Sequence, residues 1–292
     1  MNFKKILGEI FVAFIPNKMS RNRWRGLFRY GLIRVIKLWN KVKNDNSKPD
    51  YYLTCCAIAK NEGEYFIEWI EYHKNLGVEK FYIYDNESSD NTKEILAPYI
   101  KSGIVDYTYL AGLKQQLPAY NHCIEKHRLE AYWIAFIDLD EFIVPQKDKN
   151  IPDFLKRFES FAAIEINWLI YGSGGAKKRE IGSVMERFKC HSVPTNVLNR
   201  HVKNIVNPRR IVSMVGSHEA VKLSGCTVDS HGKPIKKFFR NRQPQHDVIR
   251  INHYATKSYE EFSEKNARGR VASFKKRDAS YFNTFDLNDI KE

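Results

Sequence analysis

An apolar run that ends in three carboxylates decides the fold of this chain: Tyr132-Trp133-Ile134-Ala135-Phe136-Ile137-Asp138-Leu139-Asp140-Glu141-Phe142. A short continuous apolar run of this kind is typical of a strand that is buried on both faces. Asp138 and Asp140 are two residues apart, so an extended backbone would aim both side chains to the same side. Ligands of open α/β sheets bind beyond the carboxyl ends of the strands. The stretch therefore predicts a site for Mg²⁺ or Mn²⁺, hard ions that bind carboxylates and can hold a diphosphate.

A D-x-D tripeptide is also common in solvated turns, so the residues before it have to support this prediction. They alternate between strand and helix patterns, which indicates right-handed βαβ units and a mainly parallel sheet. Neither G-x-G-x-x-G nor G-x-x-x-x-G-K-[ST] is present in this half, which disfavours a dinucleotide-binding Rossmann domain and a P-loop NTPase. The predicted strands cover residues 52–59, 80–84, 104–109 and the run that ends at Asp138, and a helix over 118–131 precedes the last of them.

Polar residues follow two of these strands where they end. They are Lys60, Asn61 and Glu62 after the first strand, and Asp85 and Asn86 after the second. Their side chains can recognise a base and a ribose, and they can equally serve as helix caps and turn residues. Both interpretations are open from the sequence.

The composition bounds the class of partner. The 292 residues contain 48 Lys and Arg against 34 Asp and Glu, which gives a formal net charge of +14 and a pI near 9.4. Such a charge predicts an acidic partner, which is nucleic acid, anionic lipid or a phosphorylated substrate. The length fits one large domain, with or without appendages. The five cysteines form no C-x-x-C pair, a pattern of reduced thiols in a cytosolic protein.

Residues 1–50 differ in pattern from the rest of the chain. Basic residues alternate with large apolar ones at helical spacing over 18–43, and a polar linker follows over 44–50. This amphipathic pattern suits a helix on an anionic membrane surface, and it also suits a helix packed on the adjoining domain. No apolar run approaches the roughly 20 residues that cross a bilayer. We therefore predict a cytoplasmic protein, peripheral on the inner face of the cell membrane.

Five runs of the chain carry a family resemblance: Ala57-Ile58-Ala59-Lys60-Asn61-Glu62, Glu68-Trp69-Ile70-Glu71-Tyr72-His73, Tyr84-Asp85-Asn86-Glu87-Ser88-Ser89-Asp90, Ala119-Tyr120-Asn121-His122-Cys123 and Phe136-Ile137-Asp138-Leu139-Asp140-Glu141-Phe142. In this order they resemble glycosyltransferase family 92 and the related bacterial family 2-like transferases. The resemblance implies a GT-A fold over 51–292, with a nucleotide-binding half (51–145) and an acceptor half (146–292). It also implies a nucleotide-sugar donor such as a UDP-sugar, a divalent ion, inversion at the anomeric carbon, and a place for Asn121 in the donor site.

The acceptor half contains further candidates. Trp168 can stack on a sugar face or belong to the core. An inverting transfer needs a carboxylate that takes the proton of the acceptor hydroxyl. Glu186, in a Glu-Arg-Phe run that matches the family pattern, is the predicted base. Glu219 and Asp229 are alternatives, and each of the three can instead form a surface salt bridge.

His253 is predicted as the third ligand of the ion. It ends a predicted strand, and a set of Asp138, Asp140 and one imidazole suits Mn²⁺ while leaving positions for diphosphate oxygens. His218 is the alternative ligand. Lys257 follows His253 closely enough to pair with a phosphate, and this element resembles the late H-Y…K element of other GT-A transferases.

These features together predict a metal-dependent, inverting glycosyltransferase. The acceptor would be a glycan or glycolipid in surface polysaccharide or lipopolysaccharide synthesis, with no nucleic acid as partner. In this mechanism Asp140 and His253 hold the ion, and Asp138 assists it or contacts the ribose. Two alternatives are open. A basic nucleic-acid-binding protein would not need either aspartate, and a catalytically inactive module would bind a sugar nucleotide without transferring it.

Overall fold

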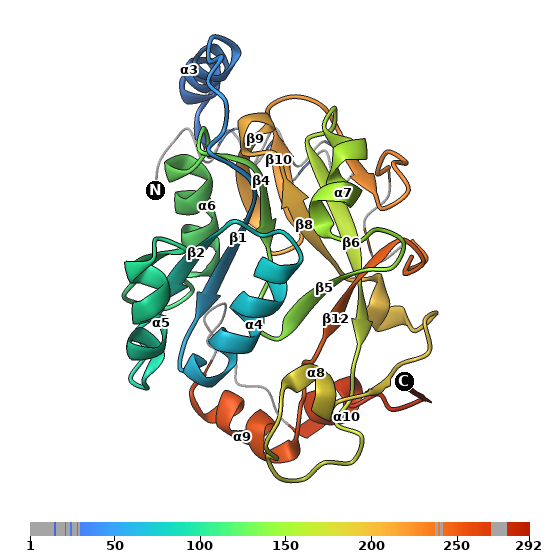
Figure 1. Ribbon diagram of the computed structural model, residues 1–292. Helices are drawn as coiled ribbons and strands as arrows, with labels where there is room; N and C mark the ends of the chain where they lie inside the picture. The colour runs from blue at the N-terminus through green and yellow to red at the C-terminus, as the bar shows by residue number, and fades with distance from the viewer. Residues whose placement is uncertain are drawn as a thin grey trace.

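A mixed β-sheet with helices on both faces forms the body of the protein (Figure 1). The computed structural model describes residues 30–236, 239, 242–269 and 279–292, together with residues 15, 21, 24 and 28. Within these residues, nine strands form the main sheet in the order β3-β2-β1-β4-β8-β6-β12-β5, and β11 pairs with β6. This arrangement confirms the predicted α/β class of GT-A type.

The first half of the sheet is parallel, as the sequence predicts. β2 and β4 flank β1, and β3 extends the sheet beyond β2, each in parallel register. The third helix ends before the predicted residue 131, because residues 127–130 form the bend and turn that lead into β4. The elements are β1 (Tyr51–Ala59), α4 (Gly63–Asn75), β2 (Lys80–Asp85), α5 (Thr92–Lys101), β3 (Val105–Tyr109), α6 (Gln116–Lys126) and β4 (Ala131–Phe136).

Antiparallel strands join the second half of the chain to this sheet. β8 pairs antiparallel with both β4 and β6, and β12 pairs parallel with β6 and antiparallel with β5. One continuous sheet thus contains strands from both sides of residue 145, and the predicted division into two halves stays a prediction. The elements are β5 (Glu141–Pro145), α7 (Ile151–Leu155), β6 (Ala163–Ile170), α8 (Val184–Arg187), β7 (Cys190–His191), β8 (Val202–Val206), β9 (Ile211–Gly216), β10 (Glu219–Lys222), β11 (Thr227–Asp229), β12 (Ile249–His253), α9 (Tyr259–Ala267), α10 (Ala279–Phe285) and β13 (Ile290–Lys291).

Alternate residues of β1 serve two separate cores, since successive side chains of a strand point to opposite faces. Cys55 packs with Trp69 of α4 in the core that also receives α5 and α7. Cys56 packs with Tyr120 of α6 in a second core that is completed by the hairpin of β9 and β10. With both faces covered, β1 is buried from Leu53 to its end, which explains its continuous apolar pattern. All five cysteines of the chain are free.

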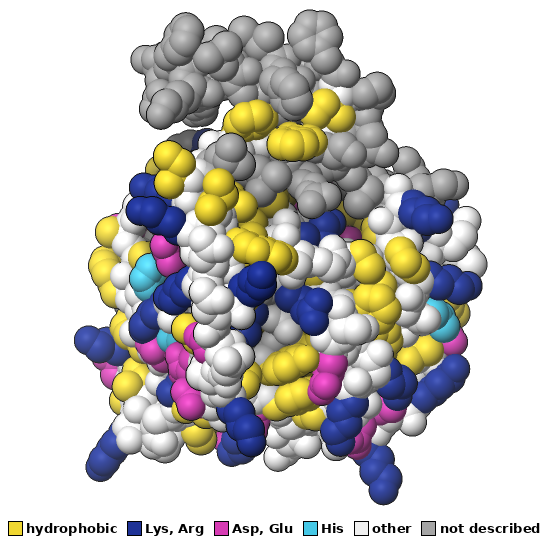
Figure 2. Space-filling model, turned by 90° about the horizontal axis from the view of Figure 1, so that it is seen from above, with side chains coloured by type: hydrophobic (Ala, Val, Ile, Leu, Met, Phe, Trp, Pro, Cys, Tyr) yellow, Lys and Arg dark blue, Asp and Glu magenta, His cyan; other side chains and the backbone are white. Residues whose placement is uncertain are grey.

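The helix α3 (Leu32–Lys43) precedes β1 and lies at the opposite end of the molecule from α9 (Figure 1). It is the described part of the predicted basic segment; residues 1–14, 16–20 and most of 21–29 lie outside the described residues. No described helix has the length and apolar character needed to cross a bilayer. Figure 2 views the molecule from the α3 end and shows Lys and Arg side chains distributed over this face rather than gathered in one stripe.

Candidate active site

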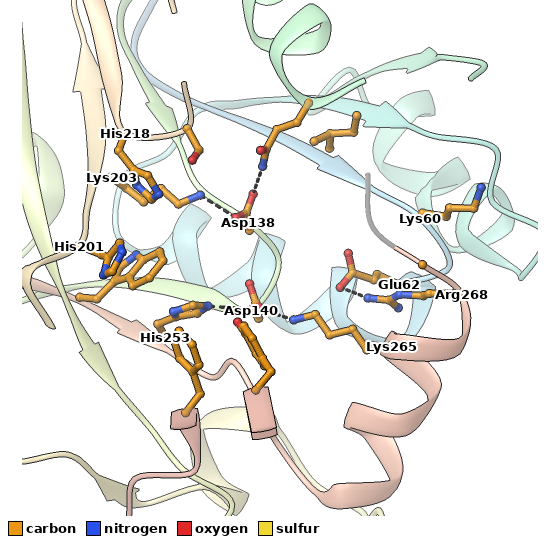
Figure 3. Close-up of a pocket in the computed structure, with 17 residues that line it drawn as sticks. Lys60, Glu62, Asp138, Asp140, His201, Lys203, His218, His253, Lys265 and Arg268 are labelled. Atoms are coloured by element: carbon orange, nitrogen blue, oxygen red, sulfur yellow. Dashed lines mark hydrogen bonds and ion pairs between the residues drawn. The ribbon is translucent and has the colours of Figure 1, made fainter. Parts of the chain in front are cut away.

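A cavity of about 410 Å³ lies at the carboxyl ends of β1 and β4, where the sequence predicts a ligand (Figure 3). The end of β1, the connection from β4 to β5, and residues of β6, β8, β12 and α9 form its walls. Because the parallel strands end together here, residues far apart in the sequence meet at one edge of the sheet. The predicted site residues that line the cavity are Lys60, Glu62, Asp138, Asp140, Trp168 and His253, together with the alternative ligand His218.

The two aspartates of the D-x-D sequence lie in the connection after β4 rather than in the strand. β4 ends at Phe136, and a hydrogen bond from the Glu141 N–H to the Asp138 carbonyl (3.1 Å) closes the turn. The chain reverses here because β5 runs antiparallel to β12, which is itself parallel to β6. The expectation of an extended backbone is therefore wrong. Asp138 and Asp140 still line the same cavity, but they have separate partners.

Asp138 is held by side chains of β8 and α6. Its Oδ2 accepts a hydrogen bond from Lys203 Nζ at 2.6 Å, and its Oδ1 accepts from the Tyr120 hydroxyl at 3.1 Å and from Gln116 Nε2 at 3.3 Å. The Lys203 side chain is 1% exposed and also lies 3.3 Å from Glu141 Oε2. Burial raises the pKa of Asp138, but Lys203 outweighs burial and keeps that pKa below its ordinary value. Asp138 is therefore ionised at neutral pH.

Asp140 is held by side chains of α9 and β12. Its Oδ2 accepts a charged hydrogen bond from Lys265 Nζ and lies 3.5 Å from His253 Nε2. Figure 3 shows Lys265 reaching from α9 into the cavity toward this carboxylate. Burial raises the pKa of Asp140, but Lys265 and His253 together hold it well below its ordinary value. Burial in turn lowers the pKa of His253, so its imidazole is neutral at pH 7.

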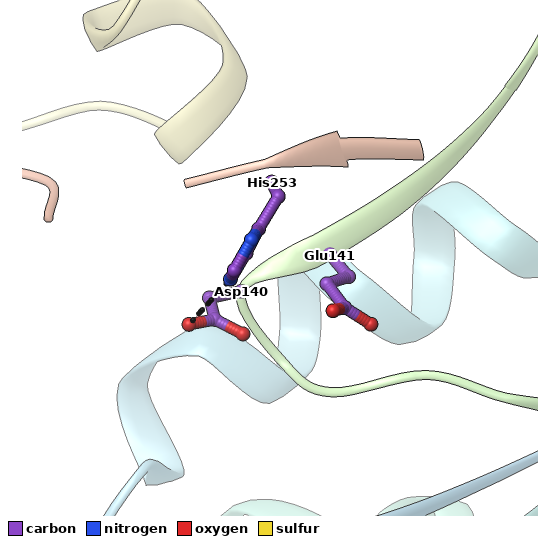
Figure 4. A group of neighbouring side chains, drawn as sticks. All are labelled: Asp140, Glu141 and His253. Atoms are coloured by element: carbon purple, nitrogen blue, oxygen red, sulfur yellow. Dashed lines mark ion pairs between the residues drawn. The ribbon is translucent and has the colours of Figure 1, made fainter. Parts of the chain in front are cut away.

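Asp140, Glu141 and His253 form a group that fits a divalent ion (Figure 4). All three are buried, and their ligand atoms lie within 4.8 Å of one another. Two atoms of this group, Glu141 Oε1 and His253 Nδ1, are buried without a hydrogen-bond partner. Buried polar atoms seldom lack a hydrogen-bond partner in the protein unless a water or a ligand binds them. Two carboxylates with one imidazole suit Mn²⁺. The structure thus brings Asp140 and His253 together, with Glu141 where the sequence suggested Asp138.

Glu141 is the most enclosed of the three carboxylates, with no exposed surface. Its Oε2 accepts a hydrogen bond from the Asp138 N–H at 2.9 Å. Burial raises the pKa of Glu141 well above its ordinary value; Lys203 opposes this, and Asp138 and Asp140 add to it. A cation bound beside Glu141 would favour its ionised form.

An aromatic wall completes the cavity next to His253. Trp168 stacks on His201 with ring centroids 5.0 Å apart, and its ring centroid lies 4.2 Å from that of His253. His218 meets Trp168 edge-on at 5.5 Å and donates from Nδ1 to the Val202 carbonyl at 2.5 Å. Burial lowers the pKa of His218 to about 3, so this ring is neutral. His218 is not in the ion-binding group. The aromatic wall suits stacking on a sugar ring, and this role of Trp168 stays a prediction.

The rim of the cavity joins the loop after β1 to the end of α9. Glu62 accepts a hydrogen bond from the Arg268 guanidinium, which also donates to the Asn61 carbonyl. Asn61 does not cap α4, since Glu62 occupies that position; the Asn61 Oδ1 instead accepts from the Ser89 N–H at 2.7 Å. The donor-site role of Asn61 stays a prediction, because its side chain does not line the cavity.

Three other predicted donor residues do not line the cavity and bind neighbouring segments of the chain. Asp85 Oδ1 accepts from the Ser88 N–H at 2.9 Å. Asn86 Nδ2 donates to the Leu110 carbonyl at 2.9 Å, and Asn121 Oδ1 accepts from the Met214 N–H at 2.7 Å. The bonds of Asp85 and Asn86 fit the interpretation as turn residues, whereas the bond of Asn121 joins α6 to β9. Contact of Asp85, Asn86 and Asn121 with a nucleotide stays a prediction.

Lys257 lines a second, smaller cavity of about 240 Å³ beside the first. Its Nζ lies 3.8 Å from the centroid of the Tyr65 ring. Burial lowers the pKa of Lys257 to about 8, and the nearby Lys265 contributes to this. Lys265 and Arg268 line both cavities, so the end of α9 is shared between them. The predicted pairing of Lys257 with a phosphate stays a prediction.

The predicted base, Glu186, is exposed and lies outside the cavity lining. It forms a capping box with Ser183 at the start of α8. This structural role accounts for a glutamate at this position without a catalytic role. The alternative Asp229 accepts backbone hydrogen bonds within a turn, and neither it nor Glu219 lines the cavity. The geometry therefore supports none of the three as the base, and the assignment stays a prediction.

Sequence reasoning did not single out Lys203 and Lys265, the two cations that bind the aspartates. Lys203 is a lone charge in the apolar pattern of β8, and a charge in a buried strand requires a partner. Lys265 lies three residues after the buried Phe262, on the same side of α9. Both signals are present in the sequence, although neither identifies the partner.

Comparison with known proteins gives the family. A profile of glycosyltransferase family 92 matches residues 50–290. A family 92 glycosyltransferase protein of Ricinus communis is 28% identical over 233 residues, covering 78% of this chain and 39% of its own length. A galactan β-1,4-galactosyltransferase of Arabidopsis thaliana is 25% identical, with 59% of this chain and 36% of its own length covered. The chain thus spans about two fifths of the length of these curated relatives.

Among solved structures, residues 1–349 of S. aureus TarS superpose with a TM-score of 0.35 at 17% identity, covering 54% of this chain and 47% of that one. At this score the likeness supports no argument about ligand or mechanism. The family profile, by contrast, spans nearly all of the sheet and every wall of the cavity. The chain therefore belongs to glycosyltransferase family 92.

Proposed function

We propose that the protein is a metal-dependent, inverting glycosyltransferase that moves a sugar from a nucleotide-sugar donor to a glycan or glycolipid hydroxyl. Family membership supports the transfer. The observation that carries the metal dependence is the buried group of Asp140, Glu141 and His253, with two of its polar atoms left without partners. An α/β sheet that ends in such a group has the ligands for Mn²⁺ or Mg²⁺ where a donor would bind.

A nucleoside diphosphate sugar, such as a UDP-sugar, fits the cavity in size and charge. The volume of about 410 Å³ lies within the range of small-ligand pockets. Cationic side chains line the cavity on several sides and can pair with phosphate oxygens. They are Lys60, Lys203, Lys265 and Arg268.

The ion, when bound, would offset the negative charge that develops on the leaving diphosphate. Asp140, Glu141 and His253 would hold it. Asp138 keeps its bonds to Lys203 and Tyr120 and presents an ionised carboxylate to a ribose or sugar hydroxyl. The aromatic wall beside His253 would keep water away from the reacting carbon.

The proposed acceptor class rests on the relatives. Relatives named as galactan β-1,4-galactosyltransferases support a hexose as the transferred sugar and a polysaccharide hydroxyl as the acceptor. We propose a surface polysaccharide or a glycolipid as the class, with lipopolysaccharide as one member of it.

The test is a thermal-shift panel of nucleotide sugars, with Mn²⁺ or with a chelator. We expect one donor to raise the melting temperature only in the presence of Mn²⁺, because a ligand stabilises the state that binds it. Asp140→Asn should abolish this shift, whereas Glu264→Gln, on the exposed side of α9, should retain it. A donor that stabilises the protein equally in chelator would refute the metal dependence, and retention of anomeric configuration in the product would refute inversion.

We also propose that α3 lies on an anionic membrane surface on the cytoplasmic side. Ile33, Ile36 and Trp39 are exposed at 71%, 53% and 43%. Lys37 and Lys41 lie beside them on the helix, which contains no acidic residue. Exposed apolar side chains next to basic ones complement the headgroups and acyl boundary of an anionic bilayer.

This location is tested by sedimenting the full chain with vesicles of phosphatidylcholine, with or without phosphatidylglycerol. We expect binding to the anionic vesicles alone, lost in Lys37→Glu/Lys41→Glu and weakened in Ile36→Ser/Trp39→Ser. The matched control Lys93→Glu/Lys101→Glu, on α5, changes the net charge equally and should bind as the wild type does. Equal loss in this control, or self-association through α3 in place of vesicle binding, would contradict the proposal.

A further inference from the structure

Lys265 binds the carboxylate that the ion-binding group needs. Asp140 Oδ2 accepts from Lys265 Nζ and faces His253 Nε2, and the same Asp140 belongs to the group with Glu141. An ammonium and a divalent ion that lie against one carboxylate oxygen repel each other, since both are positively charged. A divalent ion that binds Asp140 through Oδ2, the oxygen that faces His253, therefore competes with Lys265 for that oxygen.

Lys265 stays in the cavity after such a replacement, because α9 is anchored at both ends. At its start, the Ser258 hydroxyl and the Arg187 guanidinium both bind Glu261, the latter through two bonds of 2.9 Å. At its end, Arg268 binds Glu62. A lysine on the last turn of a fixed helix can change the direction of its side chain but not leave the site.

We propose that Lys265 is an exchangeable counter-ion: it neutralises Asp140 before the ion binds, and it pairs with the donor diphosphate afterwards. The inference rests on the proposed metal dependence and adds a role for a residue of this chain. In the free protein, Lys265 keeps a buried carboxylate satisfied. With the ion at Asp140, its ammonium is released beside a cation, and a dianionic ligand relieves the repulsion between the two charges.

Two opposite effects of one substitution follow. Removing the ammonium removes a competitor, so Lys265→Met should bind Mn²⁺ more tightly, by about tenfold for a coupled pair of this kind. The same substitution removes a charged hydrogen-bond donor, so UDP should bind more weakly in saturating Mn²⁺, again by about tenfold. A residue that only supports the fold would change both affinities in the same direction.

The experiment measures Mn²⁺ binding by electron paramagnetic resonance and UDP binding by calorimetry, with the full chain. Wild type, Lys265→Met, Lys265→Arg and Glu264→Gln are compared. Lys265→Arg keeps the charge and should resemble the wild type for Mn²⁺, and Glu264→Gln, on the same turn of α9, should change neither affinity. The melting temperature of Lys265→Met should rise more with Mn²⁺ than that of the wild type, because its uncompensated Asp140 gains more from the ion.

The outcomes separate this inference from the proposed function. Tighter Mn²⁺ with weaker UDP in Lys265→Met confirms the exchange. Unchanged or weaker Mn²⁺ binding in that variant, with Mn²⁺ binding to the wild type abolished by Asp140→Asn, overturns the exchange and leaves the metal site. Absence of Mn²⁺ binding in the wild type overturns both.

Discussion

Two lysines neutralise the two aspartates of the D-x-D sequence, and they differ in how they are held. Lys203 lies within β8 between two hydrogen-bonded neighbours, β4 and β6, and its side chain is 1% exposed. Lys265 lies on the last turn of α9, and its side chain is 13% exposed. The first is part of the sheet, whereas the second is delivered by a helix that follows it.

This difference separates a permanent charge from a replaceable one. Lys203 is shared by Asp138 and Glu141 at 2.6 and 3.3 Å, and these acids raise its pKa although burial lowers it. If Lys203 moved away, the two buried carboxylates would lose their shared cation and would repel each other. Lys265 binds Asp140, which also belongs to the proposed ion-binding group. We therefore expect Lys203 to keep its place in the sheet whatever binds, and the Lys265 side chain of α9 to move when an ion binds.

The largest effect that separates the two regions is expected from Lys203→Met. It leaves Asp138 and Glu141 buried without their cation, which costs about 3–5 kcal/mol of the free energy of unfolding. Denaturant unfolding in the absence of metal measures this loss. Lys265→Met should cost much less, because its carboxylate lies beside a cavity that water can enter. Equal losses in the two variants would remove the distinction between a fixed and a replaceable cation.

The next effect tests whether α9 is anchored by Glu261. Burial raises the pKa of Glu261, but Arg187 and Ser258 outweigh burial and lower it to about 2 from 4.5. A depressed carboxylate pKa contributes stability that is present above pH 4.5 and is lost as the pH falls toward 2. The shift corresponds to about 3 kcal/mol at neutral pH.

Glu261→Gln should therefore lower the free energy of unfolding at pH 7, and the difference from the wild type should shrink as the pH falls below 4.5. Urea unfolding at several pH values measures this. A difference that is constant with pH would show that the carboxylate charge does not hold the start of α9, and it would weaken the argument that Lys265 stays in the cavity.

The same comparison shows which parts of the molecule the sequence predicts. The strands and helices from Tyr51 to Phe136 were predictable, since their apolar periods are local and each βαβ unit brings neighbouring segments together. The proximity of Asp140 and His253 was predictable, because Asp140 follows β4 and His253 ends β12 at the same edge of the sheet. Both the strands and helices and these two residues were predicted from the local sequence around each of them.

The cations could not be assigned because their contacts depend on pairing across long separations. Lys203 reaches Asp138 only since β8 inserts antiparallel between β4 and β6, an arrangement that no local period reveals. The place of Glu141 in the ion-binding group was missed because the backbone was expected to be extended through the D-x-D sequence. Instead, the chain leaves β4 before Asp138 and turns. A reversal of that kind depends on the partner of β5, which lies more than a hundred residues later in β12.

The smallest effect is expected at Glu186, which lies on α8 next to the Arg187 that anchors α9. Glutamine can keep the reciprocal bond of the capping box, so Glu186→Gln should leave the free energy of unfolding close to that of the wild type. If the chemistry lies within the cavity between the two lysines, turnover should also stay within about twofold of the wild type. A loss of about 10²–10⁴ in turnover with unchanged donor affinity would instead identify Glu186 as the base. It would then follow that α8 moves toward the cavity when the acceptor binds. The part of the site that changes on ligand binding would then include α8 as well as α9.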